Sequence, residues 1–94
     1  MTRDQIVQVL ESEEGKFTGG VLALRDEKEA TCFVSSPAEI LPISRVVKVE
    51  LRDPLIVLQT AKEERFFFQI TDILGFRFAV ATTTKERATG FGGR

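Results

Sequence analysis

The chain has 94 residues, 43% of them hydrophobic, with 13 basic and 14 acidic side chains and a formal net charge of -1. This length and composition predict one soluble domain with a single core. They exclude a long basic stripe of the kind that binds nucleic acid and a polybasic block directed at lipid. No apolar run approaches the ~20 residues of a membrane helix, and Met1 precedes a polar segment, so we expect no signal peptide and a cytoplasmic protein.

Two absences restrict the chemistry. Without histidine, the chain lacks the usual general base at neutral pH and the commonest metal ligand. The single cysteine, Cys32, excludes an intramolecular disulfide, and its apolar neighbours predict a small buried side chain. The adjacent carboxylates Glu13 with Glu14 and Glu63 with Glu64 are expected in solvated turns. We therefore expect a non-enzymatic protein without metal or cofactor.

Residues 2–14 allow two interpretations. Thr2 and Gln5 have the spacing of a capping box, and Gly15 could follow the end of a helix. In a helix, three residues would face the core: Ile6, Val9 and Leu10. The β-branched residues in this stretch favour an opening strand instead, and the strand is our prediction, with the helix as the alternative.

Turn residues divide the next part of the chain into short strands. Gly19 and Gly20 mark a bend or a close approach of another backbone segment. Strands are predicted at 21–25 and 30–34, joined by a charged tip at 26–29. A short extended piece at 39–43 contains Pro42 and is expected at a sheet edge.

The segment 45–70 predicts three consecutive antiparallel strands. Three residues of the first strand alternate with charged residues and should face the core: Val47, Val49 and Leu51. Asp53 and Pro54 form a turn, and residues 55–60 form the second strand. After a charged tip at 61–64, the third strand spans 65–71.

The third of these strands is aromatic. Phe66 and Phe68 share one face and are predicted to be core residues. Phe67 points to the opposite face, together with Val57 of the preceding strand. If no other element covers that face, Val57 and Phe67 form an apolar surface for a protein partner or a second copy.

Residues 72–87 are ambiguous. Asp72 could cap a helix, and a basic end suits a helix C-terminus. Against this, Phe76, Phe78 and Val80 alternate as in a strand. The Gly-rich segment 88–94 is predicted to be a flexible tail, and residues 1–87 a single domain.

The pieces GKFTGGVLALRDE, ILPISRVVKVE and LIVLQTAKEERFFFQI resemble a GRAM or bacterial pleckstrin-homology-like (PH-like) domain. The resemblance is carried by core and turn positions: Gly20, Leu24, Asp26, Pro42, Ile43, Val46, Val49, Leu58, Thr60, Phe66 and Phe68. It implies a mainly β domain of two roughly orthogonal antiparallel sheets, closed by a C-terminal helix within 72–87. We favour this helix over the strand at 72–87 for that reason.

The alternative fold is an SH3-like or Sm-like all-β barrel with 76–84 as the closing strand. An Sm-like barrel would imply a ring that binds RNA. The chain lacks the basic loops that would support RNA binding, so a nucleic-acid partner is not expected.

The leading functional prediction is a non-catalytic protein-interaction or adaptor module of PH-like fold, with a protein partner or self-association, such as a homodimer. The first alternative is binding of an anionic lipid or membrane surface by the same fold. Lipid binding would require a basic patch from four side chains: Lys16, Arg25, Lys48 and Arg52. The resemblance gives this alternative weak support, because the stretch 11–25 holds only two of these cations among three glutamates.

Overall fold

The computed structural model describes residues 1–80 of the chain. They form one α-helix, one 3-10 turn and six strands: α1 (Arg3–Glu14), β1 (Val21–Ala23), β2 (Lys28–Ser35), β3 (Ile40–Arg52), β4 (Leu55–Thr60), β5 (Arg65–Gln69), η1 (Ile70–Asp72) and β6 (Ile73–Val80). The prediction of a mainly β fold is confirmed. Residues 81–87 and the predicted tail 88–94 lie outside this part.

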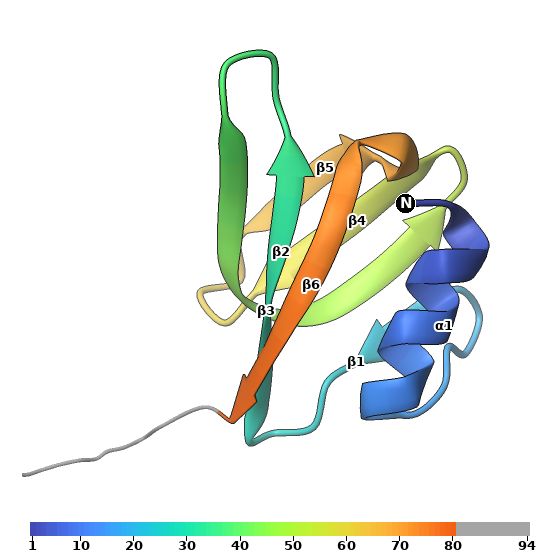
Figure 1. Ribbon diagram of the computed structural model, residues 1–94. Helices are drawn as coiled ribbons and strands as arrows, with labels where there is room; N and C mark the ends of the chain where they lie inside the picture. Colours follow the sequence, from blue (N-terminus) through green and yellow to red (C-terminus); the bar gives the residue numbers. More distant parts are fainter. Residues whose placement is uncertain (81–94) are drawn as a thin grey trace, which may run out of the picture.

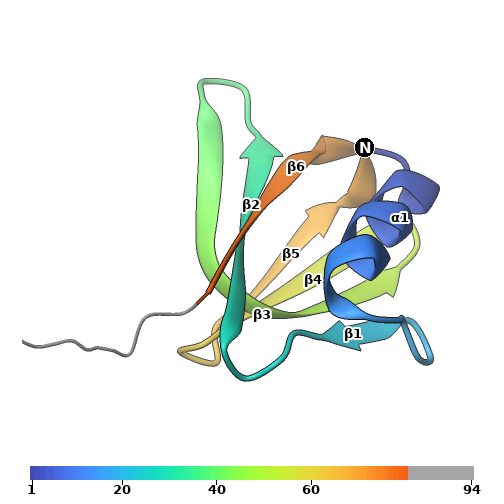
Figure 2. The same cartoon turned by 60° about the horizontal axis from the view of Figure 1, so that its bottom comes forward.

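All six strands belong to one antiparallel sheet. Five follow the order β5-β4-β3-β2-β6, and β1 pairs with β3 beside this path. The sheet is strongly curved, and α1 lies across one end of it, next to β1 (Figures 1 and 2). The hairpin formed by β2 and β3 projects beyond the other strands in both views. Strands β5 and β6 therefore form the two ends of the sheet order.

Strand β3 produces much of the curvature. Its 13 residues combine the predicted extended piece at 39–43 with the predicted strand at 45–52. Arg45 has a φ of 60°, and the register shifts between Val46 and Lys48. The prediction that Val47 faces the core is consequently wrong. The bulge turns the fully buried Val46 inward and leaves Val47 half-buried.

The N-terminal segment is a helix, so the predicted strand at 2–14 is wrong. The Thr2 hydroxyl accepts a hydrogen bond from the Gln5 amide at 3.1 Å, and the Gln5 side chain accepts one from the Thr2 amide at 2.9 Å. This capping box satisfies two amides at the helix start. Ile6 and Leu10 are fully buried, so packing against the sheet outweighs the β propensity of the branched residues.

Strand β1 lies close to the second half of β3. Gly20 accepts a hydrogen bond from the Leu51 amide at 2.8 Å and has a φ of 80°. A Cβ atom on Gly20 would lie 3.2 Å from the Leu51 carbonyl oxygen. The expected close approach of another backbone segment at this glycine is thus confirmed, and a larger residue would strain the pairing of β1 with β3.

The C-terminal helix predicted at 72–87 is wrong for the residues that the structure describes. Gln69 ends β5, the 3-10 turn η1 follows, and Ile73–Val80 forms strand β6 along β2. The alternation of Phe76, Phe78 and Val80 indicated this strand, whereas the resemblance had decided in favour of the helix. The described part of the predicted closing strand at 76–84 lies in β6.

The core lies between α1 and the inner face of the sheet, the face turned toward that helix. Buried residues from five of the six strands contribute to it, including Leu22, Cys32, Val49, Leu58 and Ile73. Phe66 and Phe68 pack against this core, as predicted, but stay half-buried. Because β5 has a neighbour on one side only, its aromatic side chains are covered on one side only.

Candidate functional site

The predicted apolar pair lies on the outer face of the sheet, opposite the core. Val57 and Phe67 are cross-strand partners of β4 and β5. Phe67 is 51% exposed, as its outward direction predicted. Val57 is only 3% exposed, because it lies in the middle of the sheet between the side chains of neighbouring strands. Val57 thus forms the floor of this surface, and Phe67 is its exposed contact group.

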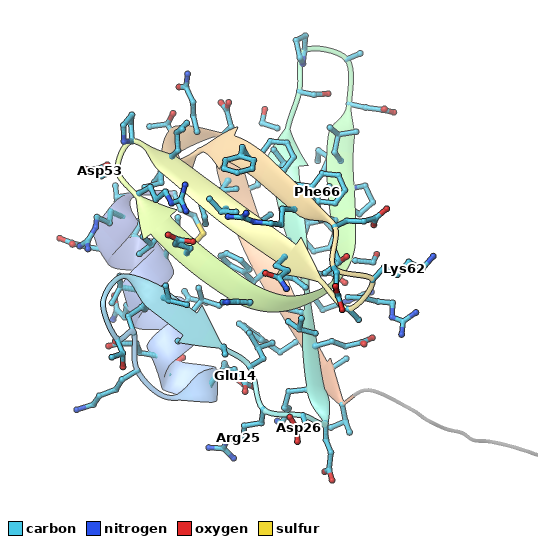
Figure 3. All side chains as sticks on the ribbon, turned by 180° about the vertical axis from the view of Figure 1, so that it is seen from behind. Glu14, Arg25, Asp26, Asp53, Lys62 and Phe66 are labelled. Carbon is cyan, nitrogen blue, oxygen red and sulfur yellow. The ribbon has the colours of Figure 1, made fainter. Side chains whose placement is uncertain are left out.

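Two of the four predicted anion contacts lie on the same face. Lys48 and Arg52 project from β3 at positions that alternate with buried residues. Arg25 lies in the turn between β1 and β2, at the foot of Figure 3, whereas Asp53, which follows Arg52, lies at the top left. Lys16 belongs to the loop between α1 and β1. The four cations therefore do not form the single patch that lipid binding would require.

A shallow cavity of about 260 Å³ opens on the outer face. Five side chains line it: Lys48, Glu50, Val57, Gln59 and Arg65. Arg65 was not among the predicted contacts, although the alternation of β5 places it on the same face as Phe67. Its guanidinium lies 5.5 Å from the centre of the Phe67 ring, so the cation and the aromatic group form one unit.

The electrostatics of this face depend on Glu50. Arg52 donates a hydrogen bond to Glu50 at 2.7 Å, and this bond holds the pKa of the Glu50 carboxyl below its usual value. Glu50 is therefore ionised at neutral pH and engaged by Arg52. Within residues 1–80, Lys48 and Arg65 have no carboxylate partner within 4.0 Å.

Within residues 1–80, the outer edge of β5 has backbone groups without a strand partner. The Ile70 amide donates to the Pro54 carbonyl at 2.9 Å, in the register that pairs β5 with β4. In an antiparallel pair every second residue bonds to the partner, so Phe66 and Phe68 bond to β4. The three alternate residues direct their N–H and C=O groups away from the sheet: Arg65, Phe67 and Gln69.

The same reasoning applies to β6. The Ser36 amide donates to the Glu39 carbonyl at 3.0 Å. Because every second residue bonds to the same partner strand, the backbone groups of Val34 bond to β3. The backbone groups of Phe33 then bond to Gly75 of β6. Two residues of β6 consequently direct their backbone groups away from the sheet: Phe76 and Phe78.

Both edge strands are aromatic on the inner face. The rings of Phe66 and Phe68 stack 6.3 Å apart, and those of Phe76 and Phe78 stack 6.2 Å apart. All four are half-buried and pack against the core. Unpaired apolar edges promote pairing with another chain, and neither β5 nor β6 contains proline or an inward charge that would oppose it.

The first part of β3 is a third stretch with a single neighbour. Residues 40–43 pair with β2 and not with β4. Pro42 is paired with Phe33, at a position whose backbone groups point away from β2. Because proline has no N–H, a donor is missing from this edge, as expected for a proline at a sheet edge.

Glu14 is not in a solvated turn, contrary to the prediction. It extends the buried stripe of Ile6 and Leu10 by one helical turn and is 5% exposed. One carboxylate oxygen lies 3.5 Å from the Arg25 amide, and the other lies 4.0 Å from the Lys28 ammonium without a hydrogen bond. The carboxylate thus connects the end of α1 to the turn between β1 and β2.

Cys32 lies in the middle of β2 and is fully buried, as predicted. Burial raises the pKa of its thiol to about 12. A thiol with this pKa is protonated at neutral pH, and a protonated thiol is a poor nucleophile.

Residues 1–80 contain no cluster of three or more acidic or cysteine side chains able to hold a metal ion. Over the same range, α1 is too short and too polar to cross a membrane. Comparisons with protein-family models, with curated proteins and with solved structures found no match.

Proposed function

We propose that the chain is a non-catalytic assembly module whose copies join edge to edge, β5 of one copy to β6 of the next. The observation that carries this proposal is the pair of unpaired, aromatic edges at the two ends of one sheet. Each edge offers free backbone donors and acceptors together with two half-buried phenylalanines. Pairing with a second chain would satisfy the backbone groups and bury the aromatic rings.

A head-to-tail contact between copies covers more edge than a symmetric one. In a two-fold dimer, β5 would pair with β5, or β6 with β6, and each copy would keep one open edge. Pairing β5 with β6 covers both ends of the sheet order in every copy, and a closed ring leaves neither β5 nor β6 exposed. We therefore propose a ring in preference to a homodimer.

The strand arrangement supports the same proposal. Strands β2 to β6 form one bent sheet that ends in a strand at residues 73–80. This arrangement agrees with the Sm-like alternative, which implies a ring, better than with PH-like orthogonal sheets closed by a helix. RNA and lipid are not part of the proposal, because the four predicted cations, Lys16, Arg25, Lys48 and Arg52, do not form one patch.

Native mass spectrometry and light scattering on the full chain test this proposal. We expect a single oligomer of defined copy number above two. A chain that stays monomeric at all micromolar concentrations would contradict the ring, and a dimer would favour the symmetric contact.

The variant Gln69→Pro tests the edge itself. Gln69 has a φ of -78°, which proline adopts, and its N–H points away from β4, so the substitution removes a donor from the edge without removing one from the sheet. We expect dissociation to folded monomers, with circular dichroism confirming the fold. Gln69→Ala keeps the N–H and should remain assembled. An intact oligomer in Gln69→Pro would overturn pairing through β5.

A further inference from the structure

The outer sheet face combines apolar and cationic groups in a way that edge assembly does not use. We define it as the side of β1, β3, β4 and β5 that is turned away from α1. Its side chains are Val21, Ala23, Lys48, Glu50, Arg52, Leu55, Val57, Gln59, Arg65, Phe67 and Gln69. Figure 3 shows β3, β4 and β5 from this side.

The charge of this face is opposite to that of the whole chain. The face carries three cations and one carboxylate, whereas the chain has a net charge of -1. The carboxylate, Glu50, is already engaged by Arg52 at 2.7 Å. Lys48 and Arg65 are left to attract an anionic ligand, and both line the same cavity.

The polar Gln59 lies between Lys48 and Arg65 across the strands, and the apolar part of the face lies beside it along β4 and β5. Val57 forms the floor of the cavity, and the half-buried amide of Gln59 lies beside it. Leu55, on the same strand as Val57, is 38% exposed, and Phe67, on the neighbouring strand, is 51% exposed. An aliphatic side chain of a ligand could cover Val57 while carboxylates on either side of it reach Lys48 and Arg65.

We propose that the outer sheet face docks an acidic segment of a partner protein, with an aliphatic side chain over Val57 and carboxylates at Lys48 and Arg65. Exposed apolar groups surrounded by polar ones are typical of a protein-binding surface, and complementary charge sets the choice of partner. The proposal does not depend on the ring, since it concerns a face of the sheet and not its edges.

The same observations disfavour other polyanions. Single-stranded nucleic acid is bound on several aromatic side chains in succession, and this face has one aromatic ring, with Arg65 already beside it. Recruitment to an anionic membrane typically takes about four to eight clustered cations. The outer sheet face has three, one of them paired with Glu50.

Fluorescence anisotropy with a labelled synthetic peptide of alternating glutamate and leucine tests the proposal. A peptide with glutamine in place of each glutamate is the matched control. We expect saturable binding of the acidic peptide that weakens with added salt, and no binding of the control. Equal binding of the two peptides would overturn the proposal, as would tighter binding of single-stranded RNA or of anionic vesicles.

Charge variants locate the binding site. Lys48→Gln and Arg65→Gln should each weaken peptide binding by about fivefold, the effect of one exposed ion pair at the upper end of its range. Arg3→Gln removes an equal charge from exposed α1 and should leave affinity unchanged. Equal affinity in all three variants would contradict the site.

Amide chemical shifts separate the face from the edges. With the acidic peptide, we expect the largest changes around Lys48, Val57 and Phe67. Changes confined to the backbone of β6 would indicate strand addition and would overturn docking on the face. A Phe78→Lys variant, altered on the opposite face of the sheet, should bind the peptide with unchanged affinity even if it no longer assembles.

Discussion

Strands β5 and β6 differ from the first part of β3, although all three lack a neighbour on one side. The β3 stretch lies on the projecting hairpin, where Ile40 is 60% exposed, and Pro42 removes a donor from its free side. The two ends of the sheet contain no proline and carry two phenylalanines each on the inner face. Proline on β3 thus distinguishes an edge that discourages pairing from the aromatic edges of β5 and β6, which are suited to it.

The largest expected effect comes from placing a charge on an open edge. Phe78→Lys introduces an inward charge on β6, the device by which many edge strands avoid pairing. We expect association to weaken by at least about 100-fold, or roughly 2.7 kcal/mol. Sedimentation equilibrium measures the change. Ile40→Lys on the hairpin is the control and should assemble like the unmodified chain, whereas equal loss in both variants would remove the distinction between the edges.

The converse change restores the missing donor on the hairpin. Pro42→Val returns an N–H to the free side of β3 and suits a strand. We expect a second, concentration-dependent association through the hairpin edge. It should be about tenfold stronger than the association of the parent chain through the same edge, as one added hydrogen bond would give. Made in the Phe78→Lys background, the variant should form dimers through the hairpin alone. If light scattering detects no dimers, Pro42 does not protect this edge.

The ionisation of Cys32 tests the packing of β2, which lies between the hairpin part of β3 and the edge strand β6. Cys32 lies opposite Ile43 of β3 and Phe76 of β6. The folded thiol keeps its proton until pH about 12, whereas an unfolded thiol ionises near pH ~8.5. The buried, protonated thiol therefore contributes its full stabilisation below pH ~8.5, and this contribution decreases as the pH rises toward 12. We expect stability to fall by up to about 1.4 kcal/mol per pH unit in this window, relative to Cys32→Ala. Parallel pH profiles in urea denaturation would contradict the burial.

The smallest effect concerns the bend that separates the two parts of β3. Arg45 has a φ of 60°, and its guanidinium pairs at 3.7 Å with Glu29 across mostly exposed surface. Arg45→Gly relieves the left-handed strain and loses a weak ion pair, so we expect a net gain in unfolding free energy of about 0.5 kcal/mol. Arg45→Ala loses the ion pair and keeps the strain, and should be slightly destabilised. Thermal denaturation of both variants tests the sign.

Sequence patterns predicted the elements whose evidence is local. Strands β4 and β5 followed from the turn residues that bound them, and the outward direction of Phe67 followed from alternation along β5. The capping residues Thr2 and Gln5 correctly indicated a helix at the N-terminus, but three β-branched residues weighed against it. Its stability comes from contacts of Ile6 and Leu10 with distant strands, which a local propensity does not contain.

Other features depend on contacts far apart in the sequence and could not be predicted. The bulge turns Val46, and not Val47, toward the core. It arises where β3 must bend and pair with two neighbouring strands. Burial of Val57 depends on its cross-strand neighbours, and burial of Glu14 depends on where α1 meets the sheet. The cation Arg65 could have been included in the candidate site, because alternation alone puts it on the face of Phe67.

The continuity of β3 also has a consequence for unfolding. Its first part forms the hairpin with β2, and its second part lies between β1 and β4. Neither half of the sheet can therefore separate from the other without disrupting the extended conformation of β3. The chain should therefore lose its structure as one cooperative unit. In hydrogen exchange, the amides of Ile43 and Leu51, on opposite sides of the bend, should open together in a single global event.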